Sequence, residues 1–473
     1  DREANKRQAR ESMGRVTRAV YDELDRLATI VDPALQLTEF DYDGQDNLLS
    51  IADPRSLQTT YVYNGFGDQV SQTSPDTGTS TSPVDAAGNV DISTDARSET
   101  ADHTHDALDR VTEIAYGDEV VALGFDAGTN GRGQLTSITD AAGTTTWTYD
   151  ATGRVAGRAQ TTGSVTLEIG YGYDIYGRPV SLTTPSGQSL TYEYTNGELS
   201  GLKVNGSWIL NQVTYQPFGP IKGWTWGNGT TTTRLYDTDG QLTQVSSAGT
   251  STYTFFDDGL IASRTDDFVA SIPSTAGTTT FDVSSTSNRL EAVTGQLAAT
   301  YGYDAAGNTT GDGTRNFTYN DAGRMKTSTR NGVTTTYSYN GLSERVKKTS
   351  SVSTTYFAYD EAGRLIGEYD AAGELIQETV WLGDIPVATP KPDGGSGISV
   401  FYIHTDHLNA PRRITRPSDN AIVWRWDSDP FGATEANEDP DNDTVAFAYR
   451  LRFPGQYFDA ETGLHYNYFR DYD

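Results

Sequence analysis

The sequence predicts an all-β protein in which a ribbon of β-hairpins repeats along most of the chain. The composition favours strands and turns over helices, because the 473 residues include 28 Tyr and 48 Gly but only 2 Met. An aromatic residue followed by an acidic one recurs at steps close to 21 residues, usually before a short turn that contains Gly. Such a step holds two strands of about five to seven residues and two turns, which is one hairpin per repeat.

The clearest repeat unit spans residues 356–367 and reads YFAYDEAGRLIG. Phe357 and Tyr359 should share one face of the first strand, because side chains two residues apart point the same way. Asp360 suits the first position of a turn, where its carboxylate can accept from the backbone two residues on, and Gly363 suits a left-handed position. This unit is therefore predicted to be one hairpin of a wall, with Asp360 as a turn residue and not a catalytic group.

Eighteen such units, some degenerate, occupy residues 14–379, after a polar N-terminal remnant over residues 1–13. Eighteen hairpins give about 36 strands, and at ~4.8 Å between neighbours the ribbon would run about 170 Å. A twisted sheet of that size must coil on itself, and it would enclose more volume than its inward side chains can fill. The residue pair that marks each unit starts at Tyr21, Tyr42, Tyr63, Val84, His105, Phe125, Tyr149, Tyr173, Tyr194, Tyr215, Tyr236, Phe256, Phe281, Tyr303, Tyr319, Tyr339, Tyr359 and Tyr369.

Two other repeat architectures fit the period less well. Paired units would match a four-stranded propeller blade, but eighteen units would then make about nine blades, beyond the usual four to eight. A parallel β-helix has coils of similar length, yet it does not need a hairpin turn at each step. We therefore expect a coiled hairpin ribbon.

Residues 380–473 differ from the repeats in amino-acid composition. Residues 380–400 contain three prolines and the run DGGSG, which predicts a linker or an exposed loop. Residues 401–473 hold three of the five His and two of the seven Trp. We expect them to form a separate C-terminal segment.

The charge and composition exclude several classes of function. The net charge of −29 argues against nucleic acid or an anionic membrane as a direct partner. The sequence has no Cys, so neither disulfides nor thiolate metal sites can form. It has no apolar run long enough to predict a transmembrane segment. It also has no phosphate loop, dinucleotide fingerprint or nucleophile elbow, so no cofactor is expected. Because the chain begins at Asp1 without Met or a signal-like segment, we expect it to be part of a longer protein.

Two clusters could suggest a metal, and neither predicts one. His404 and His407 have a spacing that zinc could use on a helix, but no helix is predicted there and no third ligand is visible. A structural hydrogen-bonding role is favoured for these histidines. The acids at 439, 441 and 443 are spaced as in a calcium loop, but Thr444 and Arg450 replace the required Gly and Glu. An exposed acidic loop is expected there, and no metal.

The tandem units resemble the YD repeats of Rhs proteins, of the C subunits of insecticidal toxin complexes and of teneurins. The C-terminal segment resembles the Rhs core signature in four blocks, at residues 402–413 (YIHTDHLNAPRR), 424–432 (WRWDSDPFG), 451–459 (LRFPGQYFD) and 462–473 (TGLHYNYFRDYD). The resemblance implies a cocoon. In it the ribbon spirals into a large hollow shell, the Rhs core segment plugs one end, and a variable toxin domain encoded downstream is held inside.

The resemblance also implies an aspartyl autoprotease at the end of the core. It places the first part of that site at Arg470 and Asp471, and a second Asp in an Asp-Pro motif further along the parent chain, beyond residue 473. An aspartic dyad needs two carboxylates close together, so that one serves as acid and the other as base. We therefore expect no turnover from the present chain alone.

The implied function is to encapsulate the effector of a bacterial Rhs-type polymorphic toxin until it is delivered outside the producing cell or to a cell surface. The expected partner is the C-terminal toxin domain of the same parent polypeptide. Much of the family also implies a secretion-spike component. A second class stays open at this point, namely a cell-surface YD-repeat protein of adhesion or recognition that carries no cargo. The residues that follow 473 in the parent would separate the two.

Overall fold

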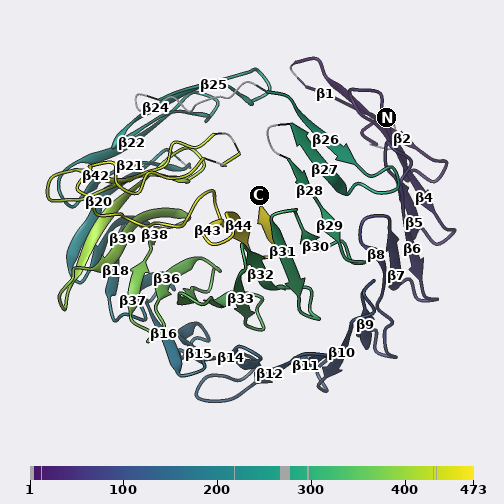
Figure 1. Ribbon diagram of the computed structural model, residues 1–473, viewed down its shortest axis with the longest axis horizontal. Helices are drawn as coiled ribbons and strands as arrows, with labels where there is room; N and C mark the ends of the chain where they lie inside the picture. The colour runs from purple at the N-terminus through teal and green to yellow at the C-terminus, as the bar shows by residue number, and fades with distance from the viewer. Residues whose placement is uncertain are drawn as a thin grey trace. The chain divides into compact units, whose positions relative to one another are not determined.

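The computed structural model describes residues 5–11, 13–217, 219–266, 277–295, 298–429, 431–432 and 434–472, and these contain strands, turns and irregular segments but no helix (Figure 1). The predicted all-β class is confirmed. The described residues include no helix with the length and hydrophobicity needed to span a membrane. By their contacts the residues fall into two compact units, one of residues 1–122, 255–260 and 275–332, the other of residues 123–254, 261–274 and 333–473.

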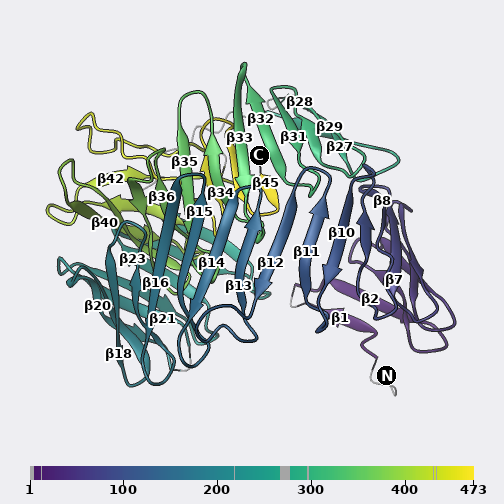
Figure 2. The ribbon, with the colours of Figure 1, turned by 90° about the horizontal axis from the view of Figure 1, so that it is seen from below.

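The strands pair in chain order. Within each sheet, the neighbouring strands whose register is described are antiparallel, as a ribbon of hairpins requires. Strands β13 to β16 illustrate this arrangement in Figure 2. The first 37 strands end at Glu378, close to the number of strands predicted for the repeats.

The largest sheet has 25 strands. They are β1 (Gln8–Arg10), β2 (Val16–Tyr21), β3 (Leu27–Val31), β4 (Leu37–Tyr42), β5 (Leu48–Ala52), β6 (Gln58–Tyr63), β7 (Gln69–Ser74), β8 (Gly78–Thr81), β9 (Ile92–Thr94), β10 (Thr100–His105), β11 (Val111–Tyr116), β12 (Val120–Phe125), β13 (Leu135–Asp140), β14 (Gly143–Tyr149), β15 (Val155–Thr162), β16 (Val165–Tyr173), β17 (Pro179–Thr183), β18 (Ser189–Thr195), β19 (Glu198–Val204), β20 (Ser207–Tyr215), β21 (Ile221–Trp226), β22 (Thr231–Tyr236), β23 (Leu242–Ser247), β24 (Gly249–Phe255) and β25 (Ile261–Asp266).

Four smaller sheets follow, of three, nine, five and three strands. The first has β26 (Thr279–Val283), β27 (Leu290–Gly295) and β28 (Ala299–Thr300). The second has β29 (Gly302–Tyr303), β30 (Thr309–Gly311), β31 (Arg315–Tyr319), β32 (Met325–Arg330), β33 (Val333–Tyr339), β34 (Arg345–Thr349), β35 (Thr354–Tyr359), β36 (Leu365–Tyr369) and β37 (Leu375–Glu378). The third has β38 (Val380–Leu382), β39 (Ile385–Pro392), β40 (Ile398–Thr405), β41 (Pro411–Thr415) and β42 (Ile422–Arg425), and the last has β43 (Tyr457–Asp459), β44 (Leu464–Asn467) and β45 (Arg470–Tyr472).

The Asp of each well-formed unit organises its own turn. Asp150 Oδ1 accepts from the backbone N–H groups of Thr152 at 2.8 Å and Arg154 at 3.1 Å. Its Oδ2 accepts from Arg154 Nε at 2.7 Å. Burial opposes ionisation, but these hydrogen bonds, including those from Arg154 and Thr152, hold the pKa of Asp150 well below its ordinary value. One carboxylate therefore satisfies the turn and fixes the Arg four residues on.

That Arg then fastens its turn to the next unit. The Arg154 guanidinium lies 4.5 Å from the ring centroid of Tyr173, and its Nη1 donates to the backbone oxygen of Asp174. The Tyr173 hydroxyl returns a bond to the backbone oxygen of Val155 at 2.8 Å. The pair of Arg26 and Tyr42 makes the same contacts. These Arg and Tyr contacts, here called the turn ladder, tie each of these turns to the one that follows it.

A β-bulge places each of these tyrosines. The register shifts immediately before Tyr149, Tyr173, Tyr194 and Tyr236. A bulge sets two residues against one on the partner strand and re-aims the side chain that follows. The alternation of side chains in the sequence did not predict these bulges. Each tyrosine needs a bulge so that its hydroxyl can reach the preceding strand.

The hairpin of residues 356–367 has the predicted turn but a different setting. Asp360 Oδ1 accepts from the N–H of Ala362 at 3.0 Å, and Gly363 has a φ of 75°. Phe357 and Tyr359 share one hydrophobic cluster, as predicted from their spacing. Tyr356 and Ala358, which alternate with them on the other face, are buried as well, in another cluster. The hairpin is therefore an inner layer with two covered faces, and the prediction of a simple wall hairpin was wrong at this position.

The two clusters define the layers of the second unit. Strands β35 and β36 pack one face against β16 to β21 and β38 to β40. The other face of β35 packs against β40 to β44 and the segment between β42 and β43. This second layer contains Trp424, Trp426 and Tyr449, all fully buried. The C-terminal segment is consequently part of the core of this unit and not an appendage.

Residues 380–400 differ from the predicted linker. They form β38, β39 and the start of β40, and Val387 and Ala388 are fully buried. Pro390 and Pro392 pair with β40 beyond the residues that pair with β38, where a strand tolerates a missing N–H. The DGGSG run at residues 393–397 is exposed, and so is the short turn at Gly383 and Asp384 between β38 and β39. Of the predicted N-terminal remnant, residues 1–4 and 12 lie outside the described residues, and Gln8–Arg10 form β1.

Candidate functional site

The C-terminal segment is anchored to the hairpin layer by a buried ion pair. Arg345 on β34 donates to both carboxylate oxygens of Asp459 on β43, at 2.5 and 3.0 Å. Both side chains are about 2% exposed. Four aromatic rings surround the guanidinium, with the Tyr466 centroid at 4.0 Å and those of Tyr337, Phe357 and Tyr457 at 5.2 to 5.3 Å. A charge this deeply buried is tolerable only when it is paired.

A second cation completes this pair. Lys348 Nζ contacts Asp459 at 2.9 Å and Glu461 at 3.1 Å. Burial alone would raise the pKa of the Asp459 carboxyl, but Arg345 and Lys348 hold it below its ordinary value. Likewise burial opposes the charge on Arg345, and Asp459 raises the pKa of its guanidinium well above the ordinary value. The cluster is therefore ionised, and it ties β34 to β43.

A buried carboxylate on the neighbouring hairpin makes a further link to β43. Glu368 on β36 accepts from the Tyr457 hydroxyl at 2.8 Å and from the Gln377 amide at 2.5 Å. Neither Glu368 nor Arg345 was singled out from the sequence, and Asp459 stood there only as the end of a motif block. Their partners lie 89 and 114 residues away in the chain, so no local pattern could have identified them.

The predicted catalytic residues lie beside this anchor. Arg470 and Asp471 belong to β45 and pair with Asn467 and Tyr466 of β44. Because neighbours in a strand point to opposite faces, Arg470 is exposed while Asp471 is half-buried. Burial raises the pKa of the Tyr337 hydroxyl, and the Asp459 and Asp471 carboxylates add to this effect. Asp471 is thus the cross-strand partner of Tyr466, one of the four rings around Arg345.

His404, the first histidine of the pair, has a structural environment. His404 Nδ1 lies 2.5 Å from Ser247 Oγ and accepts from the Ala248 N–H at 3.3 Å, while Nε2 lies 2.8 Å from Thr415 Oγ1. Burial, with a contribution from Arg413, lowers the pKa of His404 to about 3, so the imidazole is neutral. His404 belongs to strand β40, so the helical spacing that a zinc pair would use is not formed.

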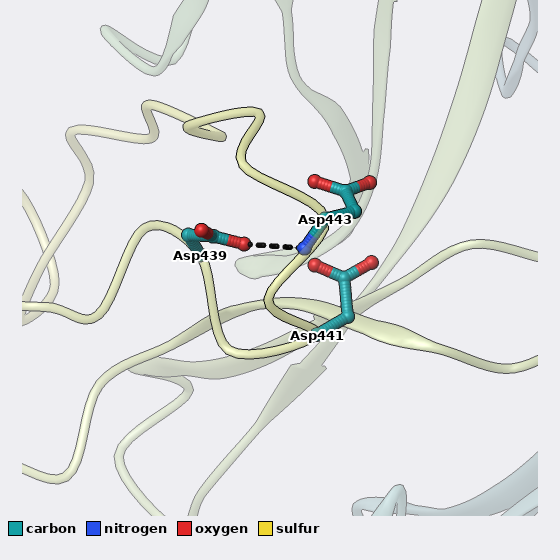
Figure 3. A group of neighbouring side chains, drawn as sticks. All are labelled: Asp439, Asp441 and Asp443. Carbon is teal, nitrogen blue, oxygen red and sulfur yellow. Dashed lines mark hydrogen bonds between the residues drawn. The ribbon is translucent and has the colours of Figure 1, made fainter.

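The three acids of the predicted loop do gather in space. Asp439, Asp441 and Asp443 each offer a carboxylate oxygen within 4.8 Å of the others (Figure 3). Asp439 also accepts from the Asp443 N–H at 3.0 Å. The guanidinium of Arg416 lies 3.3 Å from Asp441 and 3.7 Å from Asp443 and offsets part of their charge. Asp443 is exposed and the other two are half-buried, so the loop is less exposed than expected.

Comparison with known proteins identifies the repeat. The family described as RHS Repeat matches residues 42–79 and 130–166. Double-stranded DNA deaminase toxin A of Burkholderia cenocepacia is 30% identical over 192 residues, which cover 34% of this chain and 13% of that protein. The tRNA3(Ser)-specific nuclease WapA of Bacillus spizizenii is 27% identical over 180 residues, which cover 36% of this chain and 7% of that protein. The chain thus spans a small part of these curated relatives.

Solved structures with the same fold include toxin complexes. The Photorhabdus luminescens Tc holotoxin pore, determined with a TccC3 variant, matches 97% of this chain and 29% of its own, with a TM-score of 0.78 and 15% identity. The TcdB2-TccC3-TEV structure matches 97% of this chain and 30% of its own, with a TM-score of 0.77 and 16% identity. A TcdB2-TccC3 structure without its hypervariable C-terminal region matches 97% of this chain and 32% of its own, with a TM-score of 0.70.

The fold and its interlocked turns define a protein built from repeated β-hairpins. The matched repeats and the solved structures of the same fold agree with the predicted YD pattern. Two segments of the chain match the RHS Repeat family, and about a third of the chain is similar to each of two bacterial toxins.

Proposed function

We propose that this chain forms part of the encapsulating shell of a secreted, Rhs-type bacterial toxin, which holds a C-terminal effector domain of the same parent polypeptide until delivery. The observation that carries the proposal is the fold, because 97% of the chain superposes on toxin-complex structures at TM-scores up to 0.78. The similarity to two toxins over about a third of the chain supports the same proposal.

The internal construction of the chain suits a container. Where the turn ladder is formed, as at Arg154 and Tyr173, it ties one hairpin to the next without disulfides. The C-terminal segment is locked onto the hairpin layer through Arg345 and Asp459. Such a segment would resist displacement by a cargo that presses against it. A cell-surface adhesion protein without cargo would not need a C-terminal segment that resists displacement.

Protease accessibility tests the encapsulation. A cleavage site for a specific protease is placed in the effector region of the parent polypeptide, and the same site is placed at residues 393–397, which are exposed. We expect rapid cleavage at residues 393–397 and protection of the effector site until the shell is unfolded. Equal cleavage rates at the two positions would overturn the proposal and favour a surface protein without cargo.

We also propose that Asp471, with Arg470 as its electrostatic partner, supplies half of an aspartyl autoprotease that separates shell from effector. The half-buried position of Asp471, opposite Tyr466 on β44, supports this role. The second carboxylate would come from the region that follows in the parent. Two such groups held together would share one proton and activate a water.

The parent polypeptide tests this site directly. We expect it to migrate as two fragments on a denaturing gel, and the Asp471→Asn variant to migrate as one. Asp384→Asn is the matched control, because that side chain is 93% exposed and distant in sequence. Cleavage that persists in Asp471→Asn would exclude the assigned role.

A further inference from the structure

A cavity of about 520 Å³ lies between strands β16 to β19 and the turn of the β35–β36 hairpin. Its walls are rich in aromatic side chains and include one carboxylate, that of Glu361, whose ion pair with Arg158 is long at 3.9 Å. The residues that matter are Tyr171, Tyr173, Tyr192, Tyr194, Trp381 and Glu361. The volume is in the range of small-molecule sites, and none of the assigned features of the protein uses it.

The four tyrosines fall into two pairs. Tyr173 and Tyr194 belong to the turn ladder, and each already carries a guanidinium at 4.5 Å, from Arg154 and Arg178. Tyr171 and Tyr192 stand two residues earlier on the same strands. Among the described residues no cation lies over either of these two rings. They are electron-rich surfaces of the kind that elsewhere in this ribbon binds a cation.

Glu361 supplies the negative charge. Its Oε1 accepts from Trp147 Nε1 at 3.3 Å. The nearest cation is Arg158, whose Nη1 lies 3.9 Å from Oε1, and Arg158 is itself bound to Glu344 and donates to the backbone oxygen of Tyr359. Burial raises the pKa of the Glu361 carboxyl, with Arg158 opposing the effect. A cationic ligand would therefore meet a carboxylate that the protein leaves poorly compensated.

The other charges at the cavity are paired. Asp360 accepts from Arg364 Nε at 2.8 Å and caps its own turn. Arg158 and Glu344 neutralise one another behind the wall. Besides burial, the carboxylates of Glu361 and Asp360 raise the pKa of the Tyr171 hydroxyl, which reflects a negative local potential. The charge left over at the cavity is the single negative charge of Glu361.

We propose that this cavity binds an organic cation, an ammonium or guanidinium group on an aliphatic stem, with Glu361 as its counter-ion and the rings of Tyr171 and Tyr192 around the stem. A lysine or arginine side chain of a peptide carries this chemistry, and so does a free alkylamine. The net charge of −29 on the chain would favour the approach of either. The site does not depend on the proposed encapsulation.

Calorimetric titration of the full chain tests the proposal with three probes: N-acetyl-lysine methylamide, its uncharged norleucine analogue, and butylamine. We expect the lysine derivative to bind at least about tenfold more tightly than the norleucine analogue, and more weakly as salt is raised. Tighter binding of the lysine derivative than of butylamine assigns the site to a basic peptide, and the reverse order assigns it to a free amine. Equal binding of the lysine and norleucine probes would overturn the proposal.

Two variants localise the binding. Glu361→Gln keeps the shape and the acceptor for Trp147 but removes the charge, and it should weaken binding of the lysine derivative by about tenfold. The matched control is Glu374→Gln, an exposed glutamate in the next turn. Tyr192→Leu should weaken binding while Tyr192→Phe retains it, because the ring face makes the contact. If Glu361→Gln and Glu374→Gln behave alike while both unfold as the unmodified protein does, the cavity is not the site.

Discussion

Arg345 and Asp459, 114 residues apart in the chain, form a two-point ion pair that is almost wholly buried and joins the hairpin layer to the C-terminal segment. The four rings around Arg345 exclude water from the pair, and Lys348 adds a second cation to the same carboxylate. The stability of the C-terminal segment should therefore depend on this pair more than on any contact at its surface.

Removing one member of the pair should be severely destabilising. Asp459→Asn leaves the Arg345 guanidinium buried without its counter-ion, and the expected cost is about 3 to 5 kcal/mol. Denaturant unfolding gives the overall loss, and hydrogen exchange of β43 to β45 shows where it occurs. Lys222→Met, at an exposed position of β21, serves as the control and should change neither measurement. Unaltered exchange in Asp459→Asn would mean that the segment is held by other contacts.

The same pair predicts a pH dependence. Because Arg345 and Lys348 lower the pKa of Asp459 in the folded state despite its burial, the ionised carboxylate stabilises the fold above the unfolded pKa, near 3.9. That contribution is lost as the pH falls below this value toward the lower folded pKa. The difference in stability between the unmodified protein and Asp459→Asn should therefore shrink on acidification. A difference that stays constant between pH 6 and pH 3 would contradict the assignment.

The turn ladder predicts coupled behaviour of neighbouring turns. Arg154→Ala removes the bond to Asp150, the contact with the Tyr173 ring and the bond to the Asp174 backbone. Hydrogen exchange should then quicken by roughly a few-fold in the turns at 150–154 and at 174–178, because the exposed ion pair alone contributes little. Arg132→Ala, in an irregular segment, is the comparison. Faster exchange in the turn at 150–154 alone would show that Arg154 does not stabilise the turn that follows.

The two parts of residues 380–400 should tolerate insertion very differently. Two glycines inserted after Val387 shift the register of a strand that is buried on both sides, and should prevent folding or lower the melting temperature markedly. The same insertion after Gly395 lengthens an exposed turn and should be nearly neutral. Similar melting temperatures for the two variants would restore the linker interpretation.

The elements of the fold that depend on a few adjacent residues could be predicted. The spacing of the aromatic and acidic residues predicted the hairpins and their approximate number, and Asp360 and Gly363 adopt the expected turn. These features follow from side chain to backbone bonds within about five residues. The prolines of residues 380–400 misled the prediction, because whether a missing N–H costs a hydrogen bond depends on which strand lies beside it.

The candidate sites could be predicted only in part. The motif at the end of the chain pointed to Arg470 and Asp471, and the structure pairs Asp471 across β44 and β45 with Tyr466, one of the four rings around Arg345. In the sequence, Glu361 is one residue of an ordinary turn. The residues adjacent to it in the chain did not indicate that four tyrosines of other repeats line the same cavity. Those tyrosines fill equivalent positions in a sequence that repeats, so the sequence cannot distinguish them from the rest.

By itself, then, the sequence determined the all-β class, the repeated hairpin and the chemistry of each turn, since a turn is specified by residues that touch along the chain. Only the tertiary structure decided that the hairpin of residues 356–367 is covered on both faces and that Arg345 meets Asp459. It also decided that the cavity beside Glu361 remains open. Those outcomes depend on how distant layers pack, and a period of about 21 residues is the same for an outer strand and an inner one.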